Sequence, residues 1–203
     1  MIAIVDYGMG NLRSVQKALE HVGTDAVLTS DRAAIEAAKG LVFPGQGCFP
    51  DAMKQLGELG LIEVLREWVR AGRPFLGVCL GHQLIFGESE EGGPIVGLGL
   101  VPGRVVRFSP GGKVPHMGWN SIHKTDAGKA CPLLRGVEDG AYFYFVHSYY
   151  PVPEDGSLVA ATTDYNDTFA SVVWRGSFFS TQFHPEKSQA PGLRILENFV
   201  SLL

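Results

Sequence analysis

Short apolar runs alternate with amphipathic stretches through the first 80 residues. Four runs have the length and composition of strands that are buried on both faces: Ile2–Asp6, Ala26–Leu28, Leu41–Phe43 and Pro74–Val78. Between these runs, apolar residues recur at helical spacing. Strands that alternate with helices build a parallel sheet that is covered by helices on both faces. The pattern therefore predicts a doubly wound α/β fold whose sheet is mainly parallel.

Three helices are expected between these strands. The first begins at Asn11, a favourable N-cap residue, and ends at Gly23. The second is short and rich in alanine, and Ser30 or Asp31 caps it. The third spans Asp51–Arg70 and is interrupted by glycines at positions 57 and 60, which weaken a helix interior.

The second half of the chain changes character, because short β-branched and aromatic runs follow one another without long amphipathic stretches. We expect added antiparallel or mixed strands packed onto the first half, and a final helix over Leu193–Leu203. No repeat, low-complexity segment or linker divides the chain, so a single domain over residues 1–203 is expected. The expected strands are Val105–Phe108, Tyr142–Tyr150, Leu158–Thr163, Phe169–Trp174 and Phe178–Phe183.

Composition narrows the class of protein. The formal net charge of −4 gives no basic surface for nucleic acid, and no apolar run reaches the length of a membrane span. The chain begins as a strand and not as a signal peptide. Its three cysteines, at positions 48, 79 and 131, are odd in number and form no CxxC pair. We therefore expect neither a disulfide framework nor a zinc site, and a reducing cytoplasmic location.

One cysteine has the sequence setting of a catalytic nucleophile. Cys79 follows the apolar run that ends at Val78, lies two residues from both Gly77 and Gly81, and precedes a helix-like segment. This order of strand, tight turn and helix is the pattern of a nucleophile elbow. The glycines leave room for the turn, and the start of a helix favours the thiolate form of a cysteine. Taken alone, the same pattern also fits a buried cysteine at the end of a strand.

A histidine and a carboxylate at the end of another strand supply the partner groups. His184 follows the run Phe178–Phe183, and Glu186 lies two residues further on, beyond Pro185. Imidazole transfers protons near neutral pH, and a carboxylate can hold its tautomer and stabilise the imidazolium. We expect His82 to point away from the thiol and His147 to be a hydrogen-bonded core residue. Cys48 and Cys131 are weaker candidates for the nucleophile, since neither has glycines on both sides.

A second glycine-rich turn follows the strand Leu41–Phe43. Gly45, Gln46 or Gly47 could present a backbone N–H to an oxyanion, together with the N–H of Leu80 after the nucleophile. The turn that starts at Gly8 resembles half of a dinucleotide fingerprint, but Arg13 occupies the place of its third glycine. We therefore expect no nucleotide cofactor. No histidine spacing typical of a metal site occurs either, so no metal is expected.

Together these motifs resemble a known family. The heptapeptide Gly-Val-Cys-Leu-Gly-His-Gln at 77–83 and the tetrapeptide Phe-His-Pro-Glu at 183–186 resemble the class I (triad) glutamine amidotransferases, which have a flavodoxin-like fold. Residues 5–15, the hexapeptide Pro-His-Met-Gly-Trp-Asn at 115–120 and the aromatic run at 142–149 are similar to the glutaminase subunits of imidazole glycerol phosphate synthases. The likeness covers nearly the whole chain.

The resemblance implies a reaction and a partner. Glutamine is hydrolysed to glutamate and ammonia, and the ammonia passes to a (β/α)8 cyclase subunit, so that the two chains form a heterodimer. The cyclase uses the ammonia to form imidazole glycerol phosphate in histidine biosynthesis, with an aminoimidazole carboxamide nucleotide as the second product. No cofactor is implied for the glutaminase reaction.

The resemblance also assigns roles to single residues. Cys79 is the nucleophile, and His184 and Glu186 complete its triad. The positions that hold the amino-acid end of glutamine are Gln83, Glu91, Ser148 and Tyr149, the last two through their backbone. The positions that face the cyclase or the ammonia passage are Asn11, Trp119 and Lys187, and the lysine pairs there with an acidic residue of the cyclase.

Two departures from the family pattern keep other functions open. Gln46 occupies a position where valine is usual, and His82 one where methionine or glutamine is common. Because Gly-His-Gln is commoner in other triad amidotransferases, a subunit of the anthranilate or aminodeoxychorismate synthase type remains an alternative. Two further alternatives are a cysteine hydrolase or peptidase on the same fold, and a non-catalytic interaction module.

Overall fold

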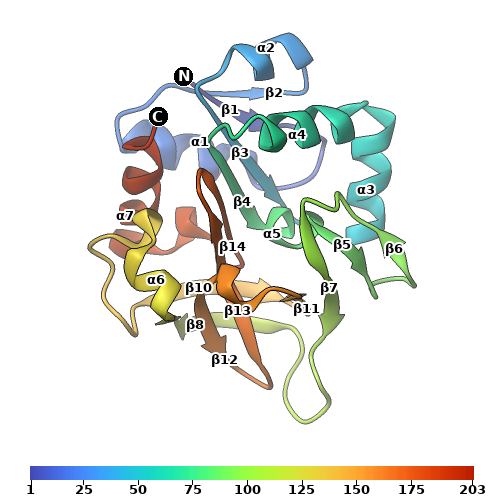
Figure 1. Ribbon diagram of the computed structural model, residues 1–203, viewed down its shortest axis with the longest axis vertical. Helices are drawn as coiled ribbons and strands as arrows, with labels where there is room; N and C mark the ends of the chain where they lie inside the picture. Colours follow the sequence, from blue (N-terminus) through green and yellow to red (C-terminus); the bar gives the residue numbers. More distant parts are fainter.

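The computed structural model describes residues 1–203 and contains an eight-stranded central sheet, which runs through the molecule in Figure 1. Its strand order is β2-β1-β3-β4-β14-β13-β12-β9. The strands are β1 (Ile2–Val5), β2 (Ala26–Thr29), β3 (Gly40–Gly45), β4 (Phe75–Cys79), β5 (Phe86–Ser89), β6 (Ile95–Val96), β7 (Val101–Arg107), β8 (His116–Ser121), β9 (His123–Lys124), β10 (Tyr142–His147), β11 (Tyr149–Pro153), β12 (Val159–Asp164), β13 (Thr168–Arg175) and β14 (Phe178–Thr181).

Seven α-helices and three short 3₁₀ helices connect these strands. No helix has the length and apolar character needed to cross a bilayer. The α-helices are α1 (Leu12–His21), α2 (Arg32–Ala37), α3 (Phe49–Glu58), α4 (Leu61–Arg70), α5 (Leu80–Leu84), α6 (Asp126–Ala130) and α7 (Gln189–Val200), and the 3₁₀ helices are η1 (Pro132–Leu134), η2 (Gly156–Leu158) and η3 (Pro185–Lys187).

The first half of the central sheet is parallel, and both of its faces are covered. Strands β1, β3 and β4 are fully buried, which explains their continuous apolar sequences. In β1, alternate side chains enter two separate cores: Ile2 and Ile4 join the core that contains residues of α1 and α7, while Ala3 and Val5 join the core that contains residues of α2, α3 and α4. The predicted doubly wound, mainly parallel architecture is thereby confirmed.

The second half adds antiparallel strands, as predicted, but distributes them over three sheets. Strand β14 pairs in parallel with β4, and β13, β12 and β9 continue the central sheet in antiparallel fashion. The other strands form a two-stranded ribbon, β10-β8, and a four-stranded sheet, β11-β7-β5-β6. The prediction of one strand over 142–150 is wrong, because the chain leaves β10 at Ser148 and enters a different sheet as β11.

The predicted helices are present, with three corrections. The helix expected over 51–70 is two helices, α3 and α4, which are separated at Gly60, whose φ of +67° interrupts a right-handed helix. Asn11 does occupy the N-cap position of α1, but its side chain makes no capping hydrogen bond. Asp31 caps α2 by accepting a hydrogen bond from the N–H of Ala34. The last helix, α7, begins four residues before its predicted start.

Candidate active site

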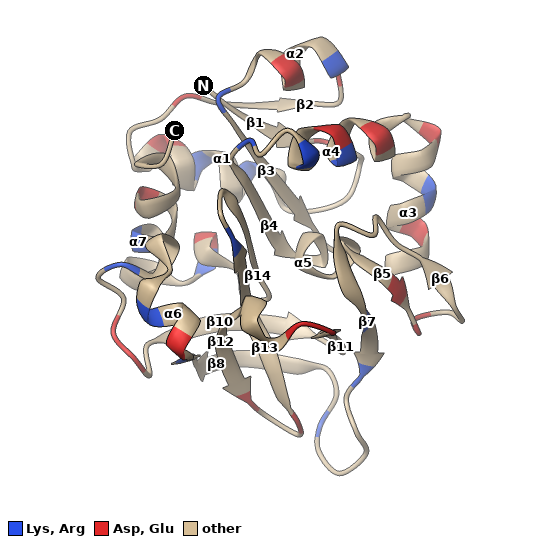
Figure 2. Cartoon of the chain, in the orientation of Figure 1, with Lys and Arg blue, Asp and Glu red and all other residues tan.

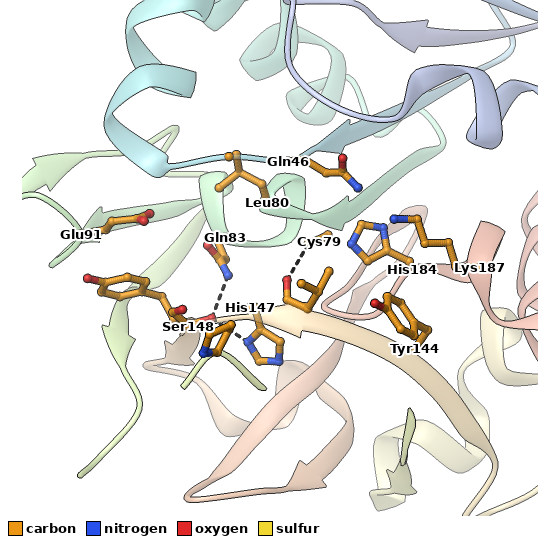
Figure 3. Close-up of a pocket in the computed structure, with 14 residues that line it drawn as sticks. Gln46, Cys79, Leu80, Gln83, Glu91, Tyr144, His147, Ser148, His184 and Lys187 are labelled. Atoms are coloured by element: carbon orange, nitrogen blue, oxygen red, sulfur yellow. Dashed lines mark hydrogen bonds between the residues drawn. The ribbon is translucent and has the colours of Figure 1, made fainter. Parts of the chain in front are cut away.

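A pocket of about 410 Å³ opens at the carboxyl ends of the central parallel strands. Ligand sites of open parallel sheets lie at this edge. In Figure 3, Cys79 lies in the middle of the pocket, with Gln83 and Glu91 toward one end and His184 and Lys187 toward the other. The lining residues are Gln46, Gly47, Cys79, Leu80, Gln83, Glu91, Pro115, Tyr144, Val146, His147, Ser148, Tyr149, His184 and Lys187.

Cys79 sits on a sharp turn between β4 and α5. Its φ of +55° is unusual for a residue other than glycine, so the turn stores local strain of the kind found in nucleophile elbows. Packing requires glycine at position 81, where a Cβ atom would lie 1.9 Å from the carbonyl oxygen of Phe43. Position 77 is tight, because a Cβ atom there would lie 3.1 Å from the carbonyl oxygen of Gly81. The side chain is only 5% exposed, and Sγ lies 3.9 Å from the carbonyl oxygen of Val146.

The sheet brings His184 next to this turn although 104 residues separate the two in sequence. Strands β4 and β14 are parallel neighbours with Val78 opposite Thr181, so the residues that follow each strand emerge at the same edge. His184 Nδ1 lies 2.8 Å from Oε1 of Glu186, and both side chains are buried. Nε2 of His184 has no other protein partner, and the ring lies beside Cys79 in Figure 3. A carboxylate, an imidazole and a thiol are thus in the order of a catalytic triad.

Opposing effects act on the pKa of His184. Burial alone lowers it, but the electrostatic attraction of the nearby Cys79 and the hydrogen-bonded Glu186 carboxylate outweigh burial and raise the pKa to about 10. The imidazole is therefore protonated at neutral pH. A protonated imidazole beside the cysteine sulfur can donate a proton to a leaving group.

Replacement of Glu186 by glutamine tests this assignment through the pH profile. The variant removes two contributions that raise the pKa of His184, so the alkaline limb of kcat/KM for glutamine should move to lower pH. We expect kcat/KM near neutrality to fall by about 10²-fold, because proton transfer becomes less efficient. An unchanged alkaline limb in the variant would show that Glu186 does not set the protonation of His184.

The structure brings three of the four predicted oxyanion donors to the pocket. Gln46, Gly47 and Leu80 line it, and the backbone N–H groups of Gln46 and Gly47 have no hydrogen-bond partner in the protein. Gly45 does not line the pocket; it lies opposite Cys79 in the β3–β4 ladder. A Cβ atom there would lie 2.1 Å from the hydroxyl oxygen of Tyr7. Gly45 is thus closely packed, and the predicted donors that line the pocket are Gln46, Gly47 and Leu80.

The four predicted substrate-binding residues also line the pocket. Glu91 is half-buried, and its Oε2 accepts a hydrogen bond from the N–H of Phe49 at 2.8 Å. Burial raises the pKa of Glu91, against the lowering effect of that hydrogen bond. Nε2 of Gln83 donates to the carbonyl oxygen of Tyr149 at 2.8 Å, whereas the N–H of Ser148 has no protein partner. A carboxylate and a free amide N–H in one pocket suit the two charged groups of an amino acid.

The rival candidates have other contacts. Cys48 donates to Oδ2 of Asp51 at 3.0 Å and does not line the pocket, while burial raises the pKa of Cys131 to about 11. His82 is fully buried between Oγ of Ser180, at 2.7 Å, and the carbonyl oxygen of Ala170, at 3.1 Å. His147 lines the pocket but directs Nδ1 to the carbonyl oxygen of Tyr149. None of these side chains competes with the group formed by Cys79, His184 and Glu186.

The residues expected at a partner interface lie on one accessible region. Lys187 lines the pocket, forms no ion pair within the chain, and has Nζ 5.8 Å from the ring centre of Tyr144. Trp119, on β8, is 46% exposed, and its ring packs edge-on against Tyr144. Asn11 is exposed at the start of α1. The turn before it packs against the end of β3, since a Cβ atom on Gly10 would lie 3.5 Å from Cα of Gly45.

Four lining residues are not among the predicted site residues: Pro115, Tyr144, Val146 and His147, the last of which was expected in the core. The strand alternation of β10 held a usable signal for two of them. Tyr144 and Val146 are two residues apart in a strand, so their side chains lie on the same face of β10. The carbonyl oxygen of Val146 lies 3.9 Å from Sγ of Cys79. This face is part of the pocket because β10 lies beside Cys79. The sequence pattern of the strand does not contain that information.

Comparison with known proteins places the chain in a family. The family model described as "Glutamine amidotransferase class-I" matches residues 3–202. The chain belongs to this family. It is therefore a glutamine amidotransferase.

Curated relatives cover this amidotransferase almost completely. It is 56% identical to a protein of Syntrophotalea carbinolica, with 98% of each chain covered, and 54% identical to one of Geobacillus kaustophilus, with 100% of this chain and 97% of the relative covered. Both relatives are named imidazole glycerol phosphate synthase subunit HisH.

Solved structures at lower identity show the same fold. A structure described as a glutamine amidotransferase has a TM-score of 0.71 at 24% identity and covers 98% of this amidotransferase and 100% of its own chain. A chain of PurLQS from Thermotoga maritima has a TM-score of 0.76 at 16% identity, with 99% and 97% covered. These likenesses support the flavodoxin-like architecture of the class I family.

Proposed function

We propose that this chain is the glutaminase subunit of an imidazole glycerol phosphate synthase, which hydrolyses glutamine and passes ammonia to a cyclase for histidine biosynthesis. One observation carries the proposal: Cys79, His184 and Glu186 meet at a pocket with amino-acid-binding groups, in a chain 56% and 54% identical to two subunits of that enzyme. The reaction needs a nucleophile, a proton carrier and oxyanion donors, and the pocket has candidates for each.

In the proposed first half-reaction, the sulfur of Cys79 attacks the side-chain amide carbon of glutamine. The carbonyl electrons move onto oxygen, and the N–H of Leu80 and one from Gln46 or Gly47 stabilise the oxyanion. Protonated His184 then gives its Nε2 proton to the amide nitrogen. The carbon–nitrogen bond breaks, ammonia leaves, and a thioester to Cys79 remains.

In the proposed second half-reaction, His184 takes a proton from water, and the resulting hydroxide adds to the thioester carbon. The same N–H donors stabilise the second oxyanion, and its collapse breaks the carbon–sulfur bond. Glutamate leaves, and the cysteine thiolate and protonated His184 return. Glu91 would pair with the substrate ammonium group and the N–H of Ser148 with its carboxylate, while Gln83 braces the wall through the carbonyl of Tyr149.

The surface beside the pocket suits a protein partner. The ribbon β8-β10 contains no Lys, Arg, Asp or Glu, in contrast to the charged helices of Figure 2. Three of its large side chains are exposed: Met117 at 62%, Tyr142 at 60% and Trp119 at 46%. An exposed apolar patch of this kind marks an interaction site. We assign the ribbon, with Asn11 and Lys187, to the contact with the cyclase, where ammonia can pass without exposure to bulk water.

The alternatives from the sequence have less support. His82 is buried and connects α5 to strands β13 and β14 by hydrogen bonds. Its presence therefore does not favour a subunit of the anthranilate or aminodeoxychorismate synthase type. A peptidase would need an open groove for a chain on both sides of Cys79, whereas one end of this pocket is occupied by Glu91 and Gln83. We also propose a cytoplasmic location, as the cysteine content suggests.

A coupled assay tests the proposed function. We expect weak glutaminase activity from the chain alone and an increase of about 5- to 150-fold with the cyclase and its phosphoribosyl ligand, the range typical of coupling between sites. Glutamate release and imidazole glycerol phosphate formation would be measured together. The control is the anthranilate synthase partner, which should not activate. Equal glutamate release with and without the cyclase would overturn the assignment of the partner.

A further inference from the structure

Two histidines outside the triad form a buried pair beside the pocket. His116, on β8, and His147, at the end of β10, lie opposite one another in the ribbon, and Nδ1 of His116 is 3.1 Å from Nε2 of His147. The pair has a polar contact at each end. Nδ2 of Asn120 lies 3.2 Å from Nε2 of His116, and Nδ1 of His147 lies 2.8 Å from the carbonyl oxygen of Tyr149.

Asn120, His116, His147 and the carbonyl of Tyr149 thus form a row of hydrogen bonds. The contacts at its two ends fix the direction of every hydrogen bond in the row. Oδ1 of Asn120 accepts from the N–H of Ser121 at 2.8 Å, so the amide presents Nδ2, a donor, to His116. His116 therefore accepts at Nε2 and carries its proton on Nδ1. A carbonyl oxygen can only accept, so His147 carries its proton on Nδ1 and accepts at Nε2. Both ends demand the same arrangement: His116 donates to His147, and His147 donates to Tyr149.

The surroundings pack closely against both rings and keep them neutral. His116 stacks between Phe145 and Tyr165 at centroid distances of 5.0 and 4.1 Å, and His147 packs against Phe169 at 4.9 Å. Burial lowers the pKa of His116 to about 4 and that of His147 to about 3. Protonation of His147 at Nε2 would also place two N–H groups face to face between the rings, and protonation of His116 at Nε2 would place an N–H against the N–H₂ group of Asn120. The row therefore keeps one set of tautomers at neutral pH.

The row ends on the peptide that forms one wall of the pocket. The carbonyl oxygen of Tyr149 accepts from both His147 and Gln83, and the carbonyl oxygen of Ser148 accepts from the N–H of Phe108 at 3.2 Å. With these carbonyls bound to protein donors, the segment cannot turn them toward the pocket. What remains for a ligand is the N–H of Ser148, which has no protein partner.

We propose that His116 and His147, oriented by Asn120, are positioning residues for substrate glutamine. They hold the Ser148–Tyr149 backbone so that it offers an N–H donor, and no carbonyl oxygen, to the substrate carboxylate. The inference rests on the proposed glutaminase function. Neither histidine touches the reacting atoms, and their effect is on substrate binding through the pocket wall.

Substitutions at His147 test the proposal. Phenylalanine fits the aromatic surroundings but removes the donor to Tyr149, so His147→Phe should raise the KM for glutamine by about 10- to 100-fold. Asparagine places an N–H₂ group where Nδ1 was, so His147→Asn should restore most of this loss. Phe169→Leu is the matched control: it loosens the packing around His147 but keeps the donor, and should leave KM unchanged. Steady-state kinetics would be measured with the cyclase present.

A second measurement separates binding from nucleophile reactivity. His147→Phe should slow the labelling of Cys79 by a glutamine-shaped diazoketone, whereas iodoacetamide, which lacks the amino-acid end, should label it at the wild-type rate. If KM and both labelling rates match wild type in His147→Phe, the proposal is wrong. The same holds if Phe169→Leu raises KM equally. Absence of turnover and of diazoketone labelling in the wild-type chain would instead refute the glutaminase function itself.

The tautomers can be measured in the wild-type chain, whatever the variants do. Nitrogen-15 NMR of labelled histidine should show protonated Nδ1 and unprotonated Nε2 in both His116 and His147 at neutral pH. A purely structural buried pair has no need for this particular direction. A proton on Nε2 of His147 with none on Nδ1 would remove the donor to Tyr149 and overturn the proposal.

Discussion

Replacement of Cys79 by alanine is expected to abolish glutaminase turnover, with a fall of about 10⁶-fold in kcat, as for other triads that lose the nucleophile. The sulfur of Cys79 is the atom that forms the thioester, and no other cysteine lines the pocket. The side chain is small and lies at the pocket, so the free energy of unfolding should change by only about 1 kcal/mol. Glutamate release and thermal unfolding would be measured on the same preparation.

The matched control for this variant is Cys48→Ala. Cys48 also follows a strand and a glycine, but its thiol is bound to Asp51 and lies outside the pocket lining, so this variant should turn over normally. Turnover that survives in Cys79→Ala and disappears in Cys48→Ala would transfer the nucleophile to Cys48. A loss of the folded state in Cys79→Ala would leave the labelling experiments above to decide the question.

Replacement of Gly81 by alanine is expected to lower the stability of the fold strongly. The new Cβ atom would lie 1.9 Å from the carbonyl oxygen of Phe43 and 3.3 Å from its ring, and a backbone oxygen in the middle of β3 cannot move aside alone. We expect a loss of at least about 3 kcal/mol in the free energy of unfolding. In a domain of this size that loss lowers Tm by about 6–12 °C.

Gly156→Ala is the control for Gly81→Ala. Nothing lies within 4 Å of a Cβ atom at Gly156, and its φ is not in the left-handed region, so Tm should stay within about 2 °C of wild type. Circular dichroism melts of both variants would make the comparison. A wild-type Tm for Gly81→Ala would show that β3 and α5 are not packed as closely as the structure places them.

The sequence contains most of the information about the parallel half of the fold. Buried strands such as β1 and β4 are continuous apolar runs, and that signal is local. The sequence does not predict that the helix breaks at Gly60, because a glycine inside a helical pattern is compatible with both a continuous helix and a left-handed turn. The sequence predicts the N-cap position of Asn11 but not whether its side chain makes a capping hydrogen bond, which depends on the side-chain rotamer.

The second half shows where local patterns stop being informative. The residues on both sides of Ser148 are aromatic and suit a strand, so nothing in the sequence marks the change of sheet there. Strand partners also come from distant parts of the chain: β14 joins β4, and β10 joins β8. The resemblance to a family identified Cys79, His184 and Glu186 as a set, while the residue pattern alone could not show that Tyr144 and Val146 face the same pocket.

The pairing of β4 with β14 limits how this sequence can vary during evolution. Val78 lies opposite Thr181, and Cys79 and His184 follow at fixed distances along the chain. One inserted or deleted residue in either strand would turn its later side chains to the opposite face and shift them by about 3.3 Å. By contrast, a surface connection such as residues 109–114 can gain several residues at an entropic cost that grows only with the logarithm of its length. Insertions and deletions among homologues should therefore accumulate in such connections and be rare in these two short strands.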